Sequence, residues 1–408
     1  MPPRVVFVNR YFHPDHSATS QMVSDLAFHL AQRGFDVAAI ASRQRYDDPR
    51  ARLVPGAERG VAVDRVWSTR FGRGGLIGRA IDYATFYASA FFALLRHARR
   101  DTTIVAMTDP PLISVVAAFA AKLRGATLVN WVQDLFPDVA EALGMRMPRT
   151  LRTLRDWSLR RARANVVLGE RMAERVPNAV VQHNWATAGL RPVAPDDNAL
   201  REWWDLGDAF VVEYSGNLGR AHEFETVLGA MHLLQNDPRI RFLIIGAGAQ
   251  LEAVRRRAPK NVVFQPYQPR ERLSESLSAG DVHLVSLQPS LEGLIVPSKV
   301  YGVLAVGRPV ISIGDPDGEV ARLIRDCGLV VAPGDSAGLA AAIRKLAADR
   351  DEAHALGARG RALYESRFAP PKALANWEAL LGFRLPVSGF RDDAPRQPET
   401  GNRKPPPS

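Results

Sequence analysis

The sequence predicts an α/β protein built from two doubly wound, Rossmann-like domains that face a central crevice. Short apolar, β-branched runs alternate with stretches of helical periodicity along nearly the whole chain. In the second half, two loops that each lead into a helix carry glycine together with a basic residue. The chain has 408 residues, which is enough for two such domains with separate cores.

In the first half the predicted strands and helices alternate, which is typical of a parallel sheet with right-handed crossovers. Glycine at position 34 indicates the end of the first helix. The expected strands cover residues 5–9, 36–41, 61–66, 103–107, 127–132, 165–168 and 180–183. The expected helices cover residues 19–32, 77–97, 111–123, where a proline begins the helix, and 149–163.

The second half repeats this alternation after a proline-rich linker at residues 189–197. We expect its strands near residues 210, 241, 262, 282, 310 and 329, and late helices at 336–348, 351–366 and 370–381. The last of these helices could cross back to the first domain. The expected boundaries are 1–190 and 198–368 for the domains, 369–385 for the final helix and 386–408 for a disordered tail rich in proline and charge.

The net charge of +10 lies entirely in the first half. Residues 1–195 hold 27 Lys and Arg against 16 Asp and Glu, whereas the remainder holds 26 against 27. This asymmetry indicates nucleic acid or an anionic membrane surface as the partner. Because the sequence carries no recognisable nucleic-acid motif, we expect the membrane surface and no nucleic acid. Two arginine-rich segments, 70–100 and 149–163, are either interfacial helices or domain helices with solvated faces.

Cysteine usage and hydropathy indicate the compartment. Cys327 is the single cysteine, which excludes an internal disulfide and a cysteine zinc cluster and favours a reducing environment. Residues 5–8 are too short for the apolar core of a signal peptide. We therefore expect a cytoplasmic protein that is peripheral on the inner face of the cell membrane.

The run from residue 291 to 311 predicts an anion site. Pro297 at the first helical position would lack only an N–H group that is unpaired there anyway. The free N–H groups that follow, beginning at Ser298, attract an anion. Lys299 adds a positive charge in a first turn, where the helix dipole disfavours a cation unless an anion is bound. This arrangement suits a phosphate or a diphosphate.

A second element of this kind follows the strand near residue 210. Gly216 and Gly219 allow backbone amides to approach a ligand closely, and Asn217 lies between them. Arg220 can donate two hydrogen bonds to phosphate oxygens. His222 is either a donor to phosphate or a simple residue of the helix start.

Other candidates for the second domain are less specific. Glu292, followed by Gly293 and Leu294, is either an acceptor for ribose or sugar hydroxyls or an exposed loop acid. Gly246 and Gly248 begin a dinucleotide-type fingerprint that lacks its third glycine. The same two glycines also fit a tight turn after a strand.

Acidic and polar residues follow two strands of the first domain. Asp134 and Asp138 come after the strand at 127–132, and Asp134 is the stronger candidate because it is nearer to the strand end. Asp138 could instead cap a helix. His13 and Asp15 come after the first strand, so contact with a substrate at the carboxyl edge of the sheet is reasonable there.

Together these residues resemble family-4 glycosyltransferases of the GT-B fold, and most of all the branch that builds bacterial capsule, O-antigen and exopolysaccharide repeat units. The resemblance spans residues 4–383 and is carried by segments 9–21, 131–138, 216–226 and 297–309. It implies transfer of a sugar from a nucleotide diphospho-sugar to an acceptor hydroxyl, with retention of configuration and without a bound metal or other cofactor. A UDP-sugar is favoured over a GDP-sugar, and the implied acceptor is a polyprenyl-diphosphate-linked glycan.

The resemblance also implies the site residues, with some departures from the family pattern. Asn217 and His222 stand where the family commonly has Arg and Lys, and Leu294 and Gly302 stand where it has a pair of glutamates. The implied donor residues are Gly216, Asn217, Gly219, Arg220, His222, Gly246, Gly248, Glu292, Gly293, Leu294, Pro297, Ser298 and Lys299. The acceptor residues are His13, Asp15, Ala18, Thr19 and Asp138, and the catalytic residues are Asp134, Arg220, Glu292 and Lys299.

Two other functions fit parts of the sequence. One is a sugar-nucleotide epimerase or an NAD-dependent oxidoreductase, against which the incomplete glycine fingerprint argues. The other is a catalytically inactive GT-B protein that acts as an assembly partner, which the missing glutamate pair keeps open. Binding of NAD would favour the first alternative, and product formation would exclude the second.

Overall fold

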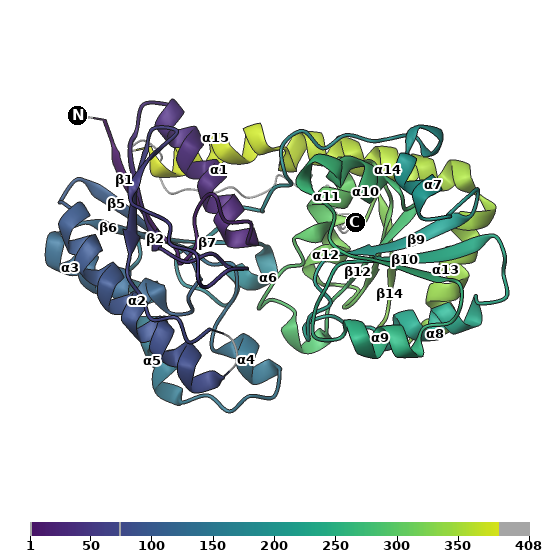
Figure 1. Cartoon of the computed structure of the whole chain (residues 1–408), viewed down its shortest axis with the longest axis horizontal. Helices are drawn as coiled ribbons and strands as arrows, with labels where there is room; N and C mark the ends of the chain where they lie inside the picture. The colour runs from purple at the N-terminus through teal and green to yellow at the C-terminus, as the bar shows by residue number, and fades with distance from the viewer. Residues whose placement is uncertain (1, 73–74, 383–408) are drawn as a thin grey trace, which may run out of the picture.

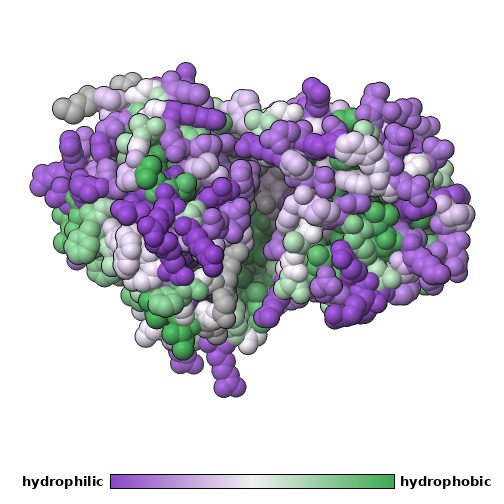
Figure 2. Space-filling view, viewed as in Figure 1, coloured by the Kyte–Doolittle hydropathy of each residue, from purple (hydrophilic) through white to green (hydrophobic). Residues whose placement is uncertain are grey.

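The computed structural model describes residues 2–72 and 75–382, and it consists of two α/β domains side by side (Figure 1). The predicted disordered tail and the end of the final segment, residues 383–385, lie outside the described residues. Space-filling Figure 2 shows a hollow between the two halves. The prediction of two Rossmann-like domains that face a crevice is confirmed.

The first domain is built on an eight-stranded sheet in the order β3-β4-β2-β1-β5-β6-β7-β8. All neighbouring strands are parallel except β3, a short strand missed from the sequence, which pairs antiparallel with β4. The strands are β1 (Arg4–Val8), β2 (Asp36–Ser42), β3 (Gly56–Glu58), β4 (Val61–Val66), β5 (Thr102–Ala106), β6 (Thr127–Trp131), β7 (Ala164–Val167) and β8 (Ala179–Val181). The helices are α1 (Ala18–Gln32), α2 (Leu76–His97), α3 (Ile113–Arg124), α4 (Asp138–Ala142), α5 (Arg149–Arg161) and α6 (Glu170–Ala173).

The second domain is built on a six-stranded parallel sheet in the order β11-β10-β9-β12-β13-β14. Its strands are β9 (Phe210–Ser215), β10 (Ile240–Ile245), β11 (Val262–Gln265), β12 (Val282–Ser286), β13 (Val310–Ile313) and β14 (Gly328–Val331). Its helices are α7 (Ala199–Trp203), α8 (Glu225–Leu233), α9 (Leu251–Arg257), α10 (Leu273–Ser278), α11 (Lys299–Ala305), α12 (Glu319–Leu323), α13 (Ser336–Ala348) and α14 (Arg350–Leu363). Single turns of 3₁₀-helix occur at Pro195–Asp197, Arg270–Arg272 and Pro289–Leu291.

Two faces of the first sheet carry separate cores. Val5 and Phe7 point to the side that α1 covers, whereas Val6 and Val8 point to the side that α2 and α3 cover. The final helix, α15 (Pro370–Leu381), packs beside α1 although it follows the second domain in sequence. Its Trp377 is fully buried, with its ring 4.4 Å from that of Trp131 at the end of β6.

The chain crosses between the domains twice, and the two crossings lie together. The first crossing begins after β8 and includes His183, whose ring contacts Phe368 edge-on at 5.2 Å. Phe368 ends the π-helical turn Tyr364–Phe368, through which the chain returns to α15. Tyr301 of α11 packs against Phe368 at 5.1 Å and joins the crossings to the second domain.

Two predicted helix starts are corrected by the structure. Helix α3 begins at Ile113 and not at Pro111, because Leu112 adopts a left-handed conformation with φ 65° just before it. Helix α11 begins at Lys299 after Ser298, so Pro297 precedes the helix and does not occupy its first position. Among the described residues, no helix is long and apolar enough to span a bilayer.

Candidate active site

The two anion-binding elements predicted for the second domain meet at Lys299. Its Nζ atom lies 3.6 Å from the centre of the Tyr214 ring, and a Cβ atom on Gly216 would lie 3.4 Å from it. The Nζ atom is buried and has no hydrogen-bond partner among the described residues. Burial lowers the pKa of Lys299 well below its usual value. The start of α11 thus places a buried amino group without a hydrogen-bond partner beside the glycine loop that follows β9.

His222 also packs against Tyr214. Its ring contacts the Tyr214 ring edge-on at 5.9 Å, and Nδ1 lies 2.7 Å from the carbonyl oxygen of Ser286. Burial, and next the charge of Lys299, lower the pKa of His222 to about 4. The imidazole is therefore neutral near pH 7, with Nδ1–H donating to Ser286 and a lone pair on Nε2.

The glycine loops after β9 and β10 pack backbone against backbone. Gly216, Gly246 and Gly248 have φ values of 136°, 139° and 149°. A Cβ atom on Gly246 would collide with the carbonyl oxygen of Gly216, and one on Gly248 would lie 2.6 Å from that of Leu218. These contacts explain Gly246 and Gly248 through the close approach of two loops.

Arg220 and Asn217 lie on the exposed rim of this loop. The backbone around them is held by side chains. The Tyr214 hydroxyl donates to the Asn217 carbonyl at 2.9 Å, and Gln288 Nε2 donates to that of Arg220 at 2.8 Å. Gln250 Nε2 donates in the same way to Gly219 and His222. The loop is therefore fixed, while the Arg220 side chain points toward solvent.

Glu292 is bonded within the second domain. Its Oε1 accepts from the backbone N–H of Glu319 at 2.8 Å, at the start of α12. Gly293, with φ 73°, lies close to the first domain, since a Cβ atom there would be 2.9 Å from Arg175 Nε. Leu294 is buried. The segment that the sequence analysis placed at the donor therefore also forms the contact between the domains.

Asp134 faces this contact from the first domain. The backbone N–H of Leu135 donates to the Leu294 carbonyl at 3.0 Å, and Asp134 forms an isolated bridge with Ile295. Asp134 Oδ1 is buried with no hydrogen-bond partner in the described part of the chain. Burial, and next the charge of Asp109, raise the pKa of Asp134 to about 7.

A small depression with a volume of about 30 Å³ opens beside Asp134, at the carboxyl ends of β5 and β6. Its lining is mostly apolar, with a few polar groups among the side chains. The lining residues are Ala106, Met107, Thr108, Pro111, Leu112, Ser114, Asn130, Trp131, Val132, Asp134, Leu135, Phe136, Arg155 and Leu159. It lies at the edge of the sheet where ligands of doubly wound folds bind.

Two of the acids predicted for the acceptor side are bonded within the first domain. Asp15 is buried, and it accepts from the backbone N–H groups of Ser17, at 2.7 Å, and Tyr46. Asp138 pairs with Arg152 at 3.2 Å and with Arg155 at 2.7 Å, so it ties α4 to α5. Both carboxylates therefore have local structural roles.

The other acceptor candidates lie around the start of α1. His13 is partly exposed, and its ring contacts Phe28 edge-on at 5.5 Å. Burial lowers the pKa of His13, and Glu58 partly opposes this change. Ala18 is exposed, and Thr19 Oγ1 accepts from Asn9 Nδ2 at 3.4 Å. None of these side chains lies in the depression beside Asp134.

Sequence reasoning missed Tyr214, Arg171 and Glu319. Tyr214 supports Lys299 from inside β9, where a strand tyrosine looks like an ordinary core residue. Glu319 Oε2 accepts from the backbone N–H of Arg171 at 3.1 Å across the domain contact. Gly169 allows this contact, because a Cβ atom there would collide with the Glu319 carboxylate. Among the described residues, no three His, Cys, Asp or Glu side chains are grouped so as to hold a metal ion.

Comparisons with known proteins cover both halves of the chain. A family model described as glycosyl transferase 4-like domain matches residues 17–186, and one described as glycosyl transferases group 1 matches residues 209–349. The probable glycosyltransferase WbjE of Pseudomonas aeruginosa is 29% identical over 253 residues, which is 58% of this chain and 63% of that protein. The putative colanic acid biosynthesis glycosyl transferase WcaI of Escherichia coli K12 is 29% identical over 269 residues, 60% of this chain and 65% of that protein.

Each match thus spans slightly less than two thirds of the curated relative. Among solved structures, Anabaena HepE in complex with UDP-glucose superposes with a TM-score of 0.69 at 16% identity. The superposition covers 93% of this chain and 99% of HepE. At that identity it supports the two-domain fold alone. The two family models, matched in order on the two domains, show that the chain belongs to the family-4 glycosyltransferases of the GT-B fold.

Proposed function

We propose that the protein transfers a sugar from a nucleotide diphospho-sugar to a lipid-linked glycan during the synthesis of a bacterial surface polysaccharide. The transfer would retain the anomeric configuration and use no metal ion. The relatives WbjE and WcaI, which carry glycosyltransferase names, support the activity, and the WcaI name supports the polysaccharide context.

The observation that carries this proposal is the buried amino group of Lys299, which has no hydrogen-bond partner among the described residues. A buried cation without a partner is costly, and a bound anion would offset that cost. The leaving diphosphate of a nucleotide-sugar supplies such an anion next to Gly216. Binding would restore the charged form of Lys299, and this charge would stabilise the negative charge that develops as the sugar leaves.

Arg220 and the amides of the loop after β9 would complete the diphosphate site. Arg220 lies on the rim of that loop, so its guanidinium could turn onto the phosphates when the donor enters. Arg220 and Lys299 together would stabilise the negative charge of the leaving diphosphate, as a bound metal ion does in metal-dependent enzymes. A UDP-sugar is the favoured donor, and the UDP-glucose complex of HepE, with the same fold, is consistent with that choice.

The acceptor would enter from the first domain. The depression beside Asp134 offers a carboxyl group with a free oxygen, which suits a hydroxyl of an acceptor sugar. The proposed acceptor is a polyprenyl-diphosphate-linked glycan at the cytoplasmic face of the membrane. The excess of basic residues in 1–195 would favour that anionic surface.

Thermal stabilisation by UDP, GDP, dTDP, ADP and NAD, each with and without EDTA, tests the donor site. A ligand that binds only the folded state raises its stability by mass action. We expect one nucleoside diphosphate to raise the melting temperature and EDTA to leave that shift unchanged. A shift with NAD alone would support the oxidoreductase alternative. No shift with any ligand, and no product, would support the inactive assembly partner.

A further inference from the structure

Helix α2 exposes an apolar stripe on the outer surface of the first domain. Ile77, Ile81 and Phe92 are 79%, 40% and 69% exposed, and Ala84 and Ala88 between them are also exposed. With 3.6 residues per turn, the five positions fall within an arc of about 80° and extend about 22 Å along the helix. A continuous exposed apolar stripe of this length is typical of an interaction site, whereas apolar residues that are exposed singly are common on protein surfaces.

The loop before α2 adds an aromatic ring to this stripe. Phe71 is 62% exposed, and a Cβ atom on Gly78 would lie 2.7 Å from the Cβ atom of Phe71. Phe71 therefore lies directly against the first turns of α2, beside Ile77 and Ile81. We call Phe71, Ile77, Ile81, Ala84, Ala88 and Phe92 the α2 strip.

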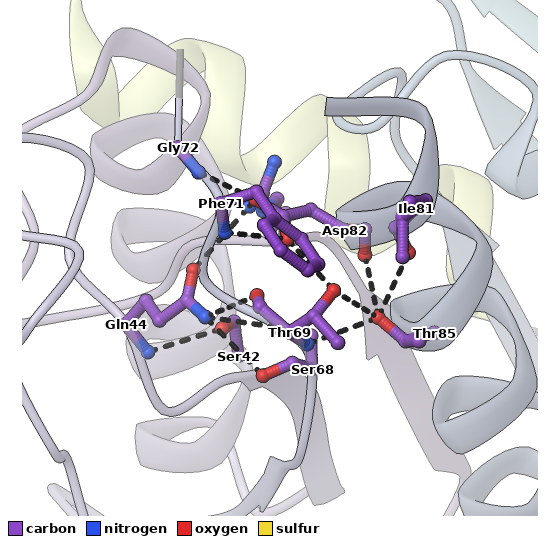
Figure 3. Close-up of polar contacts among 10 residues, drawn as sticks. Ser42, Gln44, Ser68, Thr69, Phe71, Gly72, Ile81, Asp82 and Thr85 are labelled. Carbon is purple, nitrogen blue, oxygen red and sulfur yellow. Dashed lines mark hydrogen bonds and ion pairs between the residues drawn. The ribbon is translucent and has the colours of Figure 1, made fainter. Parts of the chain in front are cut away.

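A buried polar network holds this loop in place (Figure 3). Asp82, which is 1% exposed, accepts from the Thr69 hydroxyl at 2.7 Å and from the backbone N–H groups of Phe71 and Gly72 at 3.0 Å. Gln44 Nε2 donates to the Thr69 carbonyl at 2.8 Å. The loop thus presents Phe71 outward with its own N–H group and that of Gly72 already paired, which lowers the cost of entering an apolar medium.

Arginines outnumber acidic residues around the α2 strip, where Asp64 pairs with Arg96 and Asp101 is exposed after the helix. Asp82 is the only acidic residue in the sequence of α2, and it points inward. Arg70 and Arg79 are exposed near the start of the helix, and Arg99 is exposed just after its end. An exposed apolar stripe with arginines and no exposed acid on the helix complements an anionic lipid surface.

The neighbouring helix of the same layer also exposes apolar side chains. Helix α3 packs beside α2, and its Phe119 and Leu123 are 47% and 66% exposed. Phe119 stacks on Trp157 of α5 at 4.5 Å, and the Arg161 guanidinium lies 5.0 Å from the Trp157 ring. Rings of this kind beside arginine suit the headgroup region of a bilayer.

We propose that α2 lies in the plane of an anionic membrane surface, with the α2 strip buried at the boundary between headgroups and acyl chains. The inference rests on the proposed function for the nature of the acceptor, and it names the surface through which the enzyme reaches that acceptor. The depression beside Asp134 includes Ser114 of α3, so docking through this helical layer brings it near the lipid.

Vesicle sedimentation of the full-length protein tests this inference. The probes are vesicles of phosphatidylcholine alone and of phosphatidylcholine with phosphatidylglycerol. We expect binding to the anionic vesicles only, and we expect the double variant Ile81→Gln/Phe92→Gln to lower the partition coefficient by about tenfold. The control Leu233→Gln removes a 51% exposed leucine from α8 of the second domain and should bind like the wild type. Both variants change exposed side chains, so their melting temperatures should match that of the wild type.

Equal vesicle binding by the double variant and the wild type would overturn the inference. So would a double variant that changes the oligomeric state in light scattering but not the vesicle binding, since the strip would then join two copies of the chain. The assay needs no donor or acceptor, so loss of the proposed transferase activity would not affect it. Transfer to a short-chain, water-soluble acceptor should be equal in the double variant and the wild type.

Discussion

At the scale of single residues, Lys299 and Asp134 are two ionisable residues of the candidate site that each carry a buried, unsatisfied polar atom. The Lys299 Nζ atom and the Asp134 Oδ1 atom are each buried without a hydrogen-bond partner among the described residues. They belong to different domains, on either side of the contact between Leu135 and Leu294. Burial favours the neutral form of each, so each is prepared to interact with a ligand at a cost in the stability of the empty protein.

Lys299→Met tests the proposed diphosphate site. Methionine has a similar length and no charge, so the variant should lose about a hundredfold or more in kcat. Its melting temperature should equal or exceed that of the wild type, because a buried polar group without a hydrogen-bond partner has been removed. Steady-state kinetics and calorimetry measure the two effects. The control Lys260→Met changes an exposed lysine and should leave both unchanged; an active Lys299→Met variant would exclude Lys299 from the site.

Asp134→Asn tests the buried carboxyl group. Because its pKa is raised to about 7 from an ordinary 3.8, the folded protein keeps this proton to a higher pH than the unfolded chain does. The free energy of unfolding contributed by Asp134 therefore falls as the pH rises from 3.8 through 7. We expect the melting temperature of the variant, relative to the wild type, to increase between pH 5 and pH 8. A constant difference across that range would show that Asp134 titrates normally.

At the scale of elements, the loops after β9 and β10 act as one unit. Leu218 donates its backbone N–H to the Ala247 carbonyl at 2.8 Å, and Gln250 donates to that of Leu218 at 3.0 Å. The glycines at these strand ends allow that pairing. The position of Gly216 beside Lys299 therefore depends on the neighbouring loop.

Gly246→Ala tests this dependence. The new Cβ atom would collide with the Gly216 carbonyl, and φ 139° is unfavourable for alanine, so the variant should lose about 3 kcal/mol of stability or more. It should also weaken the thermal shift produced by the nucleoside diphosphate. Chemical denaturation and nucleotide titration measure the two effects. The matched control is Gly56→Ala, where nothing lies within 4 Å of the added atom and φ is not positive.

The order of the elements could be predicted from the sequence, but several contacts of the site could not. Strand and helix periodicity predicts both sheets, because buried parallel strands are apolar runs between amphipathic helices. The start of α3 was misplaced since nothing in the sequence marks the left-handed Leu112. The bonds of Glu292 to α12 and of Asp138 to α5 depend on tertiary contacts. The local sequence pattern does not show which groups an acid will bond to in the fold. In the sequence, Glu292 and Asp138 are therefore as plausible as site residues as Asp134.

At the scale of the whole molecule, Glu319 joins the two domains beside the donor segment. It is 6% exposed and accepts from the Arg171 backbone N–H, while the Arg171 guanidinium donates to the Asp317 carbonyl at 3.2 Å. Burial raises the pKa of Glu319. Since Glu292 bonds the same turn of α12, the donor segment and the domain contact are parts of one structure.

Glu319→Ala should loosen the domain contact. The variant leaves the Arg171 N–H without its partner, which should favour separated domains. We expect a larger radius of gyration in solution scattering without ligand, and a higher KM for the donor with a smaller change in kcat. The control is Glu365→Ala, because the exposed Glu365 pairs with Arg361, four residues earlier in the chain. Identical scattering curves for Glu319→Ala and the wild type would contradict the prediction.

The paired crossings at His183 and Phe368 are two adjacent chain connections between the domains. Because the chain is continuous through both, the domains can rotate about the line of the crossings, whereas sliding or twisting would strain both connections at once. Such a rotation would displace most the parts of each domain that lie farthest from the line of the crossings. Under the proposed function, a small rotation about this line would widen the space between Lys299 and Asp134, which lie in different domains.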